Sequence, residues 1–233
     1  MNRESVFITG VSSGIGHSLA ELYLTTHDVY GLSRRTCDLP LEWHFQGDLN
    51  NFTQLEKICT SLSSQTNSIE LIVLNAALLG PIERFDNISI EECEELMRIN
   101  VWSNKLILDS LIKNKIEIKQ VVFISSGASK SAYAGWGPYS VTKASLNHLC
   151  AMYAADFPQI QFNSLAPGIV DTAMQQVLCE EVDSKRFPSV NRLREARGTE
   201  NMPTPEVQAH LLKRGIEKCL ELENGSYFDV RQL

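Results

Sequence analysis

The sequence predicts an α/β fold in which about seven mainly parallel strands form one doubly wound sheet with helices on both faces. Short apolar runs alternate with longer helical patterns along the chain, which is typical of repeated βαβ units. A glycine-rich segment follows the first apolar run and opens the first helical pattern. The length of 233 residues suits a single domain of this class. We therefore expect residues 1–233 to form one domain.

The strands and helices follow from apolar periodicity. A long helix is expected over residues 91–115, where Leu96 and Ile99 recur at helical spacing after an acidic first turn. Another is expected over residues 138–155, because proline is favoured at the first helical position. Residues 175–205 are expected to form a flexible connection and a lid that shapes substrate selection. The expected strands lie at residues 5–9, 28–33, 42–46, 69–75, 119–125, 161–166 and 226–230.

Composition excludes several classes of function. The net charge of -7 disfavours a general nucleic-acid surface. No stretch approaches the roughly 18 apolar residues of a membrane helix, and the first five residues lead directly into an apolar run, which leaves no room for a signal sequence. We therefore expect a cytoplasmic protein with no membrane partner. The six cysteines are far apart with no C-x-x-C pair, so free thiols and no metal site are expected.

The glycine-rich segment at residues 9–16 reads T-G-V-S-S-G-I-G. Gly10 would permit a tight turn, Gly14 would let the backbone approach a pyrophosphate, and Gly16 would allow close packing of helix on strand. The N-terminus of the following helix attracts negative charge. The alternative is an ordinary glycine-rich turn. In this position the segment predicts a Rossmann-type site for a dinucleotide.

The end of the second predicted strand indicates which dinucleotide binds. An NAD site places an acid against the ribose hydroxyls, but here Ser33 is followed by Arg34 and Arg35. Guanidinium groups suit a 2′-phosphate, so NADPH or NADP+ is predicted over NADH, with Arg34 as the first candidate ligand. The alternative is that the two arginines belong to a solvated loop.

Tyr139 and Lys143 are the candidate reaction centre. They lie four residues apart, on one face of the helix that starts near Pro138. The lysine and the helix N-terminus would both stabilise a phenolate, so the pKa of Tyr139 is expected to be lowered. A tyrosine so placed can exchange a proton with a carbonyl oxygen. The alternative is a surface pair of no chemical significance.

Together these motifs resemble the short-chain dehydrogenase/reductase family, and the resemblance covers nearly the whole chain. It implies that Ser126 orients the substrate carbonyl, that Tyr139 protonates the oxygen and that Lys143 also binds the nicotinamide ribose. Asn100 matches the family position that helps to hold a water in the proton relay. A capping or packing amide is the alternative for Asn100.

The resemblance also assigns the cofactor site. Asp48 would contact the adenine, and Thr172 the nicotinamide carboxamide. Ala77 stands where the family usually has glycine, and Ser13 where many NADPH-binding relatives carry a basic residue. The predicted cofactor-binding residues are Gly10, Ser12, Ser13, Gly14, Ile15, Gly16, Arg34, Arg35, Asp48, Leu49, Asn75, Ala76, Tyr139, Lys143, Pro167, Gly168, Val170 and Thr172.

The substrate is predicted from a more detailed resemblance. Residues 125–128, 135–139 and 167–175 look like those of sepiapterin reductase and bacterial benzil reductase. This implies a ketone or vicinal diketone as substrate, with Ser126, Trp136 and Met174 at the pocket. Trp136 is equally well interpreted as a core or interface aromatic. A 3-oxoacyl thioester reductase and a non-catalytic NADP-sensing protein remain alternatives, and the family implies a homodimer or a tetramer.

Overall fold

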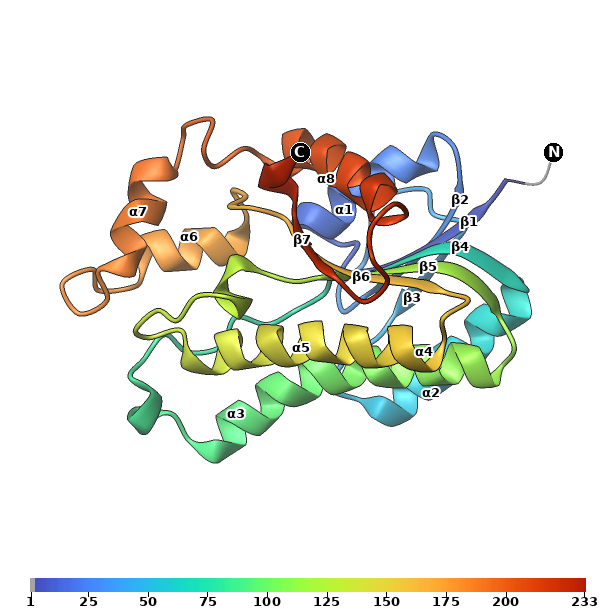
Figure 1. Ribbon diagram of the computed structural model, residues 1–233, viewed down its shortest axis with the longest axis horizontal. Coiled ribbons are helices and arrows are strands. Elements are labelled where there is room, and N and C mark those ends of the chain that lie inside the picture. Colours follow the sequence, from blue (N-terminus) through green and yellow to red (C-terminus); the bar gives the residue numbers. More distant parts are fainter. Residues whose placement is uncertain (1–2) are drawn as a thin grey trace.

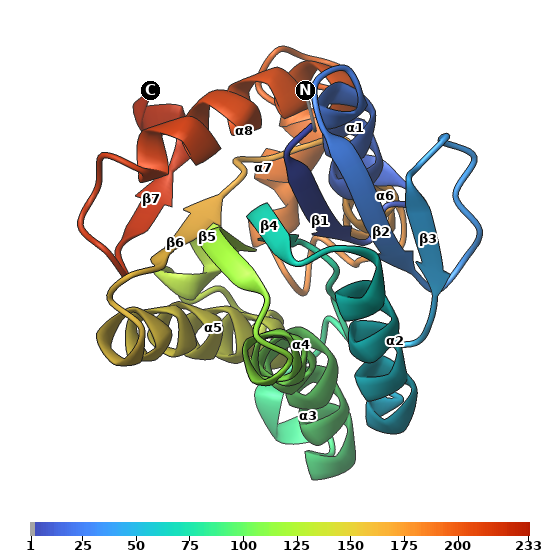
Figure 2. The ribbon, with the colours of Figure 1, turned by 90° about the vertical axis from the view of Figure 1, so that its right-hand side faces the viewer.

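The computed structural model describes residues 3–233, and its strands form one sheet of seven in the order β3-β2-β1-β4-β5-β6-β7. Every neighbouring pair is parallel, as Figures 1 and 2 show. The predicted fold class is confirmed. The strands are β1 (Ser5–Thr9), β2 (Asp28–Ser33), β3 (Trp43–Gln46), β4 (Ser68–Leu74), β5 (Glu117–Ile124), β6 (Gln161–Ala166) and β7 (Tyr227–Asp229).

Helices cover both faces of this sheet. On one face lie α2, α4 and α5, and on the other lie α1 and α8 (Figure 2). The α-helices are α1 (Gly14–Leu24), α2 (Phe52–Gln65), α3 (Ile90–Met97), α4 (Ser103–Lys113), α5 (Gly137–Asp156), α6 (Ala173–Glu180), α7 (Ser189–Ala196) and α8 (Pro205–Cys219). None of the helices described is long and apolar enough to cross a membrane.

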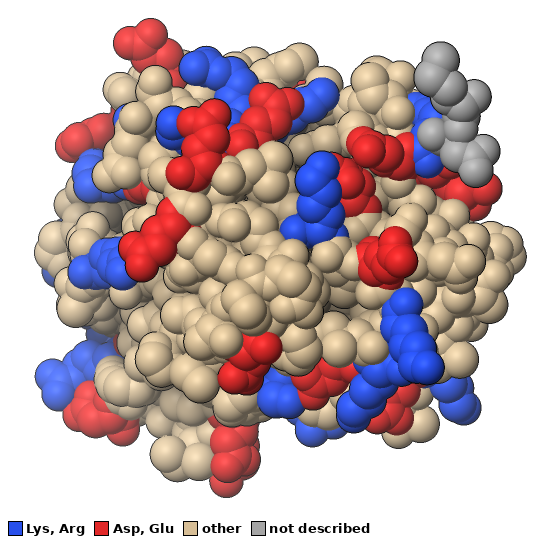
Figure 3. All heavy atoms as spheres, turned by 45° about the vertical axis from the view of Figure 1, so that its right-hand side comes forward, with Lys and Arg blue, Asp and Glu red and all other residues tan. Residues whose placement is uncertain are grey.

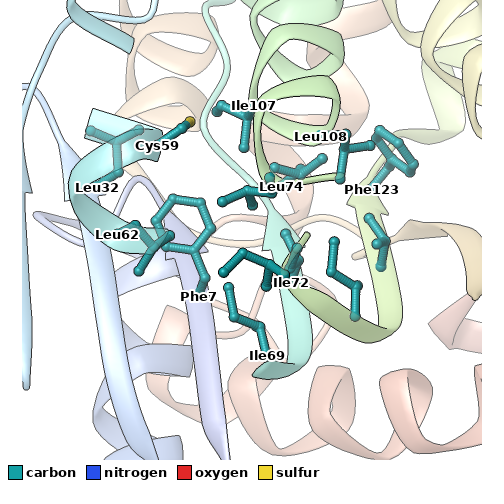
Figure 4. Close-up of a cluster of buried hydrophobic side chains, with 14 of the residues drawn as sticks. Phe7, Leu32, Cys59, Leu62, Ile69, Ile72, Leu74, Ile107, Leu108 and Phe123 are labelled. Carbon is teal, nitrogen blue, oxygen red and sulfur yellow. The ribbon is translucent and has the colours of Figure 1, made fainter. Parts of the chain in front are cut away.

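Two apolar clusters hold the layers together. Figure 4 shows Phe7, Ile72 and Phe123 of three neighbouring strands packed against Leu62 and Leu108 of the covering helices. A second cluster joins the opposite face of the strands to α1 and α8. Burial of each large apolar side chain contributes about 1.5 to 3 kcal/mol. Strands buried on both faces need continuous apolar runs, which is why the sequence predicts them well.

The helix predicted over residues 91–115 is present as a continuous helical segment from Ile90 to Lys113, with a π-helical turn in its middle that the sequence does not predict. A π-helical turn at Arg98–Trp102 separates α3 from α4, and the N–H of Ser103 donates to the carbonyl of Arg98. Asn100 lies in this turn. Extra turns of this kind are frequent at functional sites. The helix ends at Lys113 because Lys115 is left-handed, with φ of 61°.

Residues 175–205, predicted as a flexible connection, contain helices that the sequence does not predict. They contain the end of α6 and all of α7. The Arg194 guanidinium donates to the carbonyls of Cys179 and Val182 at 2.7 Å each. Leu178 and Phe187 are buried in a third apolar cluster, which also includes Tyr139. The segment therefore has its own hydrogen bonds and core, and its flexibility and its role as a lid stay predictions.

The order of the strands determines where a ligand can bind. The chain moves outward from β1 to β3 and then returns to β4 on the other side of β1. A crevice forms at the carboxyl ends of the strands at such a reversal.

The charged side chains are not separated by sign on the face of the molecule drawn in Figure 3. Basic and acidic residues are intermixed there.

Candidate active site

A cavity of about 490 Å³ lies at the carboxyl ends of the strands, within the usual size range of ligand pockets. Most of the predicted site residues come together there, from segments spread over the chain. Gly16, Asn100 and Trp136 do not line it. The predicted residues that do are Gly10, Ser12, Ser13, Gly14, Ile15, Arg34, Arg35, Asp48, Leu49, Asn75, Ala76, Ser126, Tyr139, Lys143, Pro167, Gly168, Val170, Thr172 and Met174.

The glycine loop has the geometry of a phosphate cradle. Gly10 is left-handed, with φ of 82°, and a Cβ on Gly16 would lie 2.4 Å from the Gly10 carbonyl oxygen. Gly14 is also left-handed, with φ of 60°, and opens α1 at the cavity. Only glycine tolerates these positions without strain. The free N–H groups of the first turn of α1 can therefore receive an anion.

Thr9 and Asn75 support this loop from behind. The backbone N–H groups of Asn75 and Ala76 both donate to Thr9 Oγ1 at 3.0 Å. Asn75 Nδ2 donates to the Thr9 carbonyl at 2.9 Å. These bonds end β4 at Leu74, one residue before the predicted end. This structural role of Thr9 is not predicted from the sequence, although Thr9 directly precedes Gly10 of the glycine loop.

The two arginines lie at the same end of the cavity. Arg35 Nη2 donates to Ser13 Oγ of the glycine loop at 2.8 Å. Arg34 is held through its backbone, because its carbonyl accepts a hydrogen bond from Gln46 Nε2 of β3 at 3.1 Å. Both side chains are exposed and line the cavity. The geometry therefore directs Arg35 toward the glycine loop, whereas the sequence favours Arg34.

Tyr139, Lys143 and Ser126 meet at the other end of the cavity. Pro138 is the second residue of α5, so Tyr139 lies in the first turn as predicted. Lys143 Nζ lies 5.8 Å from the centre of the Tyr139 ring and donates to the Ile124 carbonyl at 2.7 Å. Ser126 follows β5, and its Oγ accepts from the Ala128 N–H at 3.1 Å. These contacts fix the three groups against the end of β5.

Burial determines the protonation states of Tyr139 and Lys143. It raises the pKa of Tyr139 to about 12, and a hydrogen bond with Ser126 acts weakly in the opposite direction. The predicted lowering of the Tyr139 pKa is therefore wrong, because desolvation of the phenolate outweighs the other effects. Burial also lowers the pKa of Lys143 to about 8. Tyr139 is thus protonated at neutral pH and ready to donate.

Asn100 is a buried amide that holds the loop after β4. Its Oδ1 accepts from the Leu78 N–H at 2.7 Å, and its Nδ2 donates to the Leu78 carbonyl at 2.8 Å. Nδ2 also donates to Thr142 Oγ1 on α5 at 3.1 Å. The Asn100 carbonyl accepts from Asn104 Nδ2 at 2.8 Å. The side chain thus positions Leu78 on the cavity wall, and a role in proton relay stays a prediction.

Trp136 and Met174 differ in position. Met174 lines the cavity. Trp136 is buried beside Tyr139, with ring centres 6.4 Å apart, and its Nε1 donates to Ser189 Oγ at 3.1 Å. Trp136 therefore joins α5 to α7, and contact with substrate stays a prediction.

Some lining residues were not identified from the sequence. They are mostly apolar or amide side chains near the predicted motifs. Gln175 is the most informative, because its Oε1 is buried without a hydrogen-bond partner within the described chain. Buried acceptors are normally paired, so this oxygen is an exception within the described residues. The main additional lining residues are Leu78, Glu95, Ile99 and Gln175.

Comparisons with known proteins agree with this geometry. The family model described as short chain dehydrogenase matches residues 4–183. Benzil reductase ((S)-benzoin forming) of Bacillus subtilis is 30% identical, over 98% of this chain and 99% of the relative. Sepiapterin reductase of Bos taurus is 26% identical, over 83% of each chain. A short chain dehydrogenase/reductase structure from Saccharomyces cerevisiae has a TM-score of 0.84 and 26% identity, covering 97% of this chain and 96% of that one.

Proposed function

This chain belongs to the short-chain dehydrogenase family, and from that premise we propose that it is an NADPH-dependent carbonyl reductase acting on a ketone or vicinal diketone. The arrangement of Tyr139, Lys143 and Ser126 at one end of the cavity carries the proposal. The glycine loop and the arginine pair at the other end complete it. The left-handed glycines of the loop fit the pyrophosphate of a nicotinamide dinucleotide.

The chain's own residues bind and protonate the substrate. Bound NADPH supplies the hydride that reduces the carbonyl carbon. Ser126 donates a hydrogen bond to the carbonyl oxygen and orients it, and the Tyr139 hydroxyl then transfers its proton to that oxygen. The Lys143 ammonium stabilises the resulting phenolate electrostatically. Burial excludes bulk water from this exchange and strengthens each of these interactions.

The substrate class is proposed from the relatives and from the lining. Benzil reductases of Bacillus subtilis and Saccharomyces cerevisiae are both similar over nearly the whole chain. The cavity wall includes the apolar side chains of Leu78, Ile99 and Met174, which suit an aromatic or alkyl ketone. We therefore propose a vicinal diketone as the first substrate to test.

The proposed assembly is a homodimer, with a tetramer as its larger form. Trp102, Val141 and Met152 are exposed apolar side chains on the π-turn and α5. Exposed apolar groups on neighbouring helices are typical of surfaces that pair with another chain. The proposed assembly contains no nucleic acid, and its small-molecule partner is the carbonyl substrate.

Cofactor choice is tested by Arg35→Ala. We expect kcat/KM for NADPH to fall about 10- to 100-fold, because a charge-assisted hydrogen bond to the 2′-phosphate is lost. The value for NADH, which has no such phosphate, should stay nearly unchanged. Arg34→Ala gives the corresponding measurement for its neighbour.

Arg214→Ala is the matched control, because Arg214 is exposed on α8 and does not line the cavity. Equal losses with NADPH and NADH in Arg35→Ala would contradict phosphate recognition by this arginine. Steady-state kcat/KM values of each variant with NADPH and with NADH test phosphate recognition by Arg35.

The pH dependence of reduction follows from the two buried groups. Tyr139, with a pKa raised to about 12, keeps its proton well beyond neutral pH. Lys143, with a pKa lowered to about 8, loses its proton much earlier. We expect kcat/KM for carbonyl reduction to be level near neutral pH and to fall as pH rises through about 8. A rate that increases through this range would contradict the protonated form of Lys143 as the form that supports reduction.

A further inference from the structure

His17, Cys37 and Asp38 form a cluster outside the cavity that the reaction does not use. His17 lies on α1, and the other two lie in the loop after β2. One atom of each side chain lies within 4.8 Å of the others, and no second group of this kind occurs among residues 3–233. The spacing of cysteines along the chain predicts no metal site, because this group is assembled by the fold from two separate segments.

The side chains are those that bind borderline-soft divalent ions. An imidazole nitrogen, a thiolate and a carboxylate are the usual protein ligands of Zn²⁺, whereas Mg²⁺ and Ca²⁺ prefer oxygen alone. A tetrahedral Zn²⁺ with bonds of about 2.0 to 2.3 Å holds its ligand atoms about 3.3 to 3.8 Å apart. The spread of 4.8 Å is therefore within a small side-chain adjustment of this geometry. We propose that His17, Cys37 and Asp38 bind a divalent transition metal of the Zn²⁺ class, with water as the fourth ligand.

The present contacts show what binding would change. His17 Nε2 and Asp38 Oδ1 are hydrogen-bonded at 2.9 Å. Cys37 Sγ donates to the Val11 carbonyl at 3.2 Å. On binding, the thiol releases its proton to solvent and the His17–Asp38 hydrogen bond is replaced by two bonds to the ion. The exposed fractions of the His17 and Asp38 side chains are 25% and 88%, which gives the ion and its water access from solvent.

The position of the cluster gives the ion a consequence for the cofactor. Cys37 lies two residues after Arg35, and His17 directly follows the last glycine of the loop. An ion would therefore tie the arginine segment to α1 and add positive charge near the proposed phosphate site. This second part rests on the proposed function. We expect Zn²⁺ to tighten NADPH binding about fivefold.

The test uses Co²⁺ as a spectroscopic probe on the whole chain after treatment with a chelator. One equivalent of Co²⁺ should produce a thiolate-to-cobalt charge-transfer band together with the visible bands of four-coordinate cobalt, and Zn²⁺ should abolish both. Cys37→Ser should lose the charge-transfer band, and His17→Gln should bind Co²⁺ at least about tenfold more weakly. Cys93→Ser is the matched control, because Cys93 is another partly exposed free cysteine and lies on α3.

The outcomes separate the two claims. Absence of a charge-transfer band in the unmodified chain, or its persistence in Cys37→Ser, would overturn the metal site. If Cys37→Ser does not fold, the test uses His17→Gln instead. An unchanged Co²⁺ affinity in His17→Gln would also overturn the metal site. NADPH titrations with and without Zn²⁺ then test the coupling, and an unchanged affinity would overturn it. A chain that binds Co²⁺ but no NADPH would contradict the proposed function and leave the metal site supported.

Discussion

Replacing Tyr139 with Phe is expected to lower kcat for carbonyl reduction by about 10²- to 10⁴-fold, because the proton donor is lost. The ring should stay in place, since it packs among the buried side chains of the third apolar cluster and Phe keeps the same ring. NADPH binding should therefore change little. Stopped-flow or steady-state NADPH oxidation gives the rate, and a fluorescence titration gives the affinity.

Tyr133→Phe is the control for this variant. Tyr133 lies near Trp136, with ring centres 6.1 Å apart, but does not line the cavity. It should retain the full rate. An unchanged rate in Tyr139→Phe would refute Tyr139 as the acid, and a loss of NADPH binding would mean that the hydroxyl supports the cofactor instead.

Replacing Lys143 with Met is expected to lower kcat by about 10²- to 10³-fold and at the same time to stabilise the fold. Rate is lost because the phenolate of Tyr139 has no cation beside it. Stability is gained because a buried ammonium is removed: lowering the Lys143 pKa from 10.5 to about 8 corresponds to roughly 3 kcal/mol of unfavourable burial. The lost hydrogen bond to the Ile124 carbonyl offsets about 1 kcal/mol of this. A net gain of about 2 kcal/mol in the free energy of unfolding follows.

The gain should depend on pH in a defined direction. The folded-state pKa of Lys143 lies below the ordinary value of 10.5, so at pH values between the two the unfolded chain binds more protons than the folded one. The wild-type protein therefore becomes more stable as pH rises from about 8 to about 10.5, and the advantage of Lys143→Met disappears over that range. Urea unfolding at several pH values measures this. Lys57→Met, at an exposed position on α2, should show no such trend, and a variant less stable than wild type at neutral pH would contradict the account.

The central strands of this fold are predictable from the sequence because they are buried apolar runs. The predicted bounds of β1, β2 and β6 agree with the structure, and the others differ at their ends. The π-turn at Arg98–Trp102 could not be predicted in the same way. Asn100 in this turn accepts a hydrogen bond from the Leu78 N–H and donates to the Leu78 carbonyl and to Thr142 Oγ1, and these partners belong to segments far away in the sequence. Contacts between such distant segments cannot be predicted from the local periodicity of apolar residues.

The candidate site shows the same division. Glycine spacing and the Tyr139–Lys143 pair identify the two ends of the cavity, because turn geometry and helical pitch are local. The direction of the Tyr139 pKa depends on the burial of its hydroxyl, which only the packed structure provides. The contact of Arg35 with Ser13 joins two loops in the same way. The helices within residues 175–205 are not predictable in the same way, because their core partners, such as Trp136 and Tyr139, lie outside the segment.

The most direct test of the proposed function is the consumption of NADPH by the purified chain with a vicinal diketone such as benzil, repeated with NADH. We expect NADPH oxidation coupled to formation of the hydroxyketone, with a higher kcat/KM for NADPH than for NADH. A panel of monoketones, pterin ketones, quinones and 3-oxoacyl thioesters extends the measurement to other carbonyls. A chain that binds NADPH but oxidises it with none of these substrates would contradict the assignment as a carbonyl reductase.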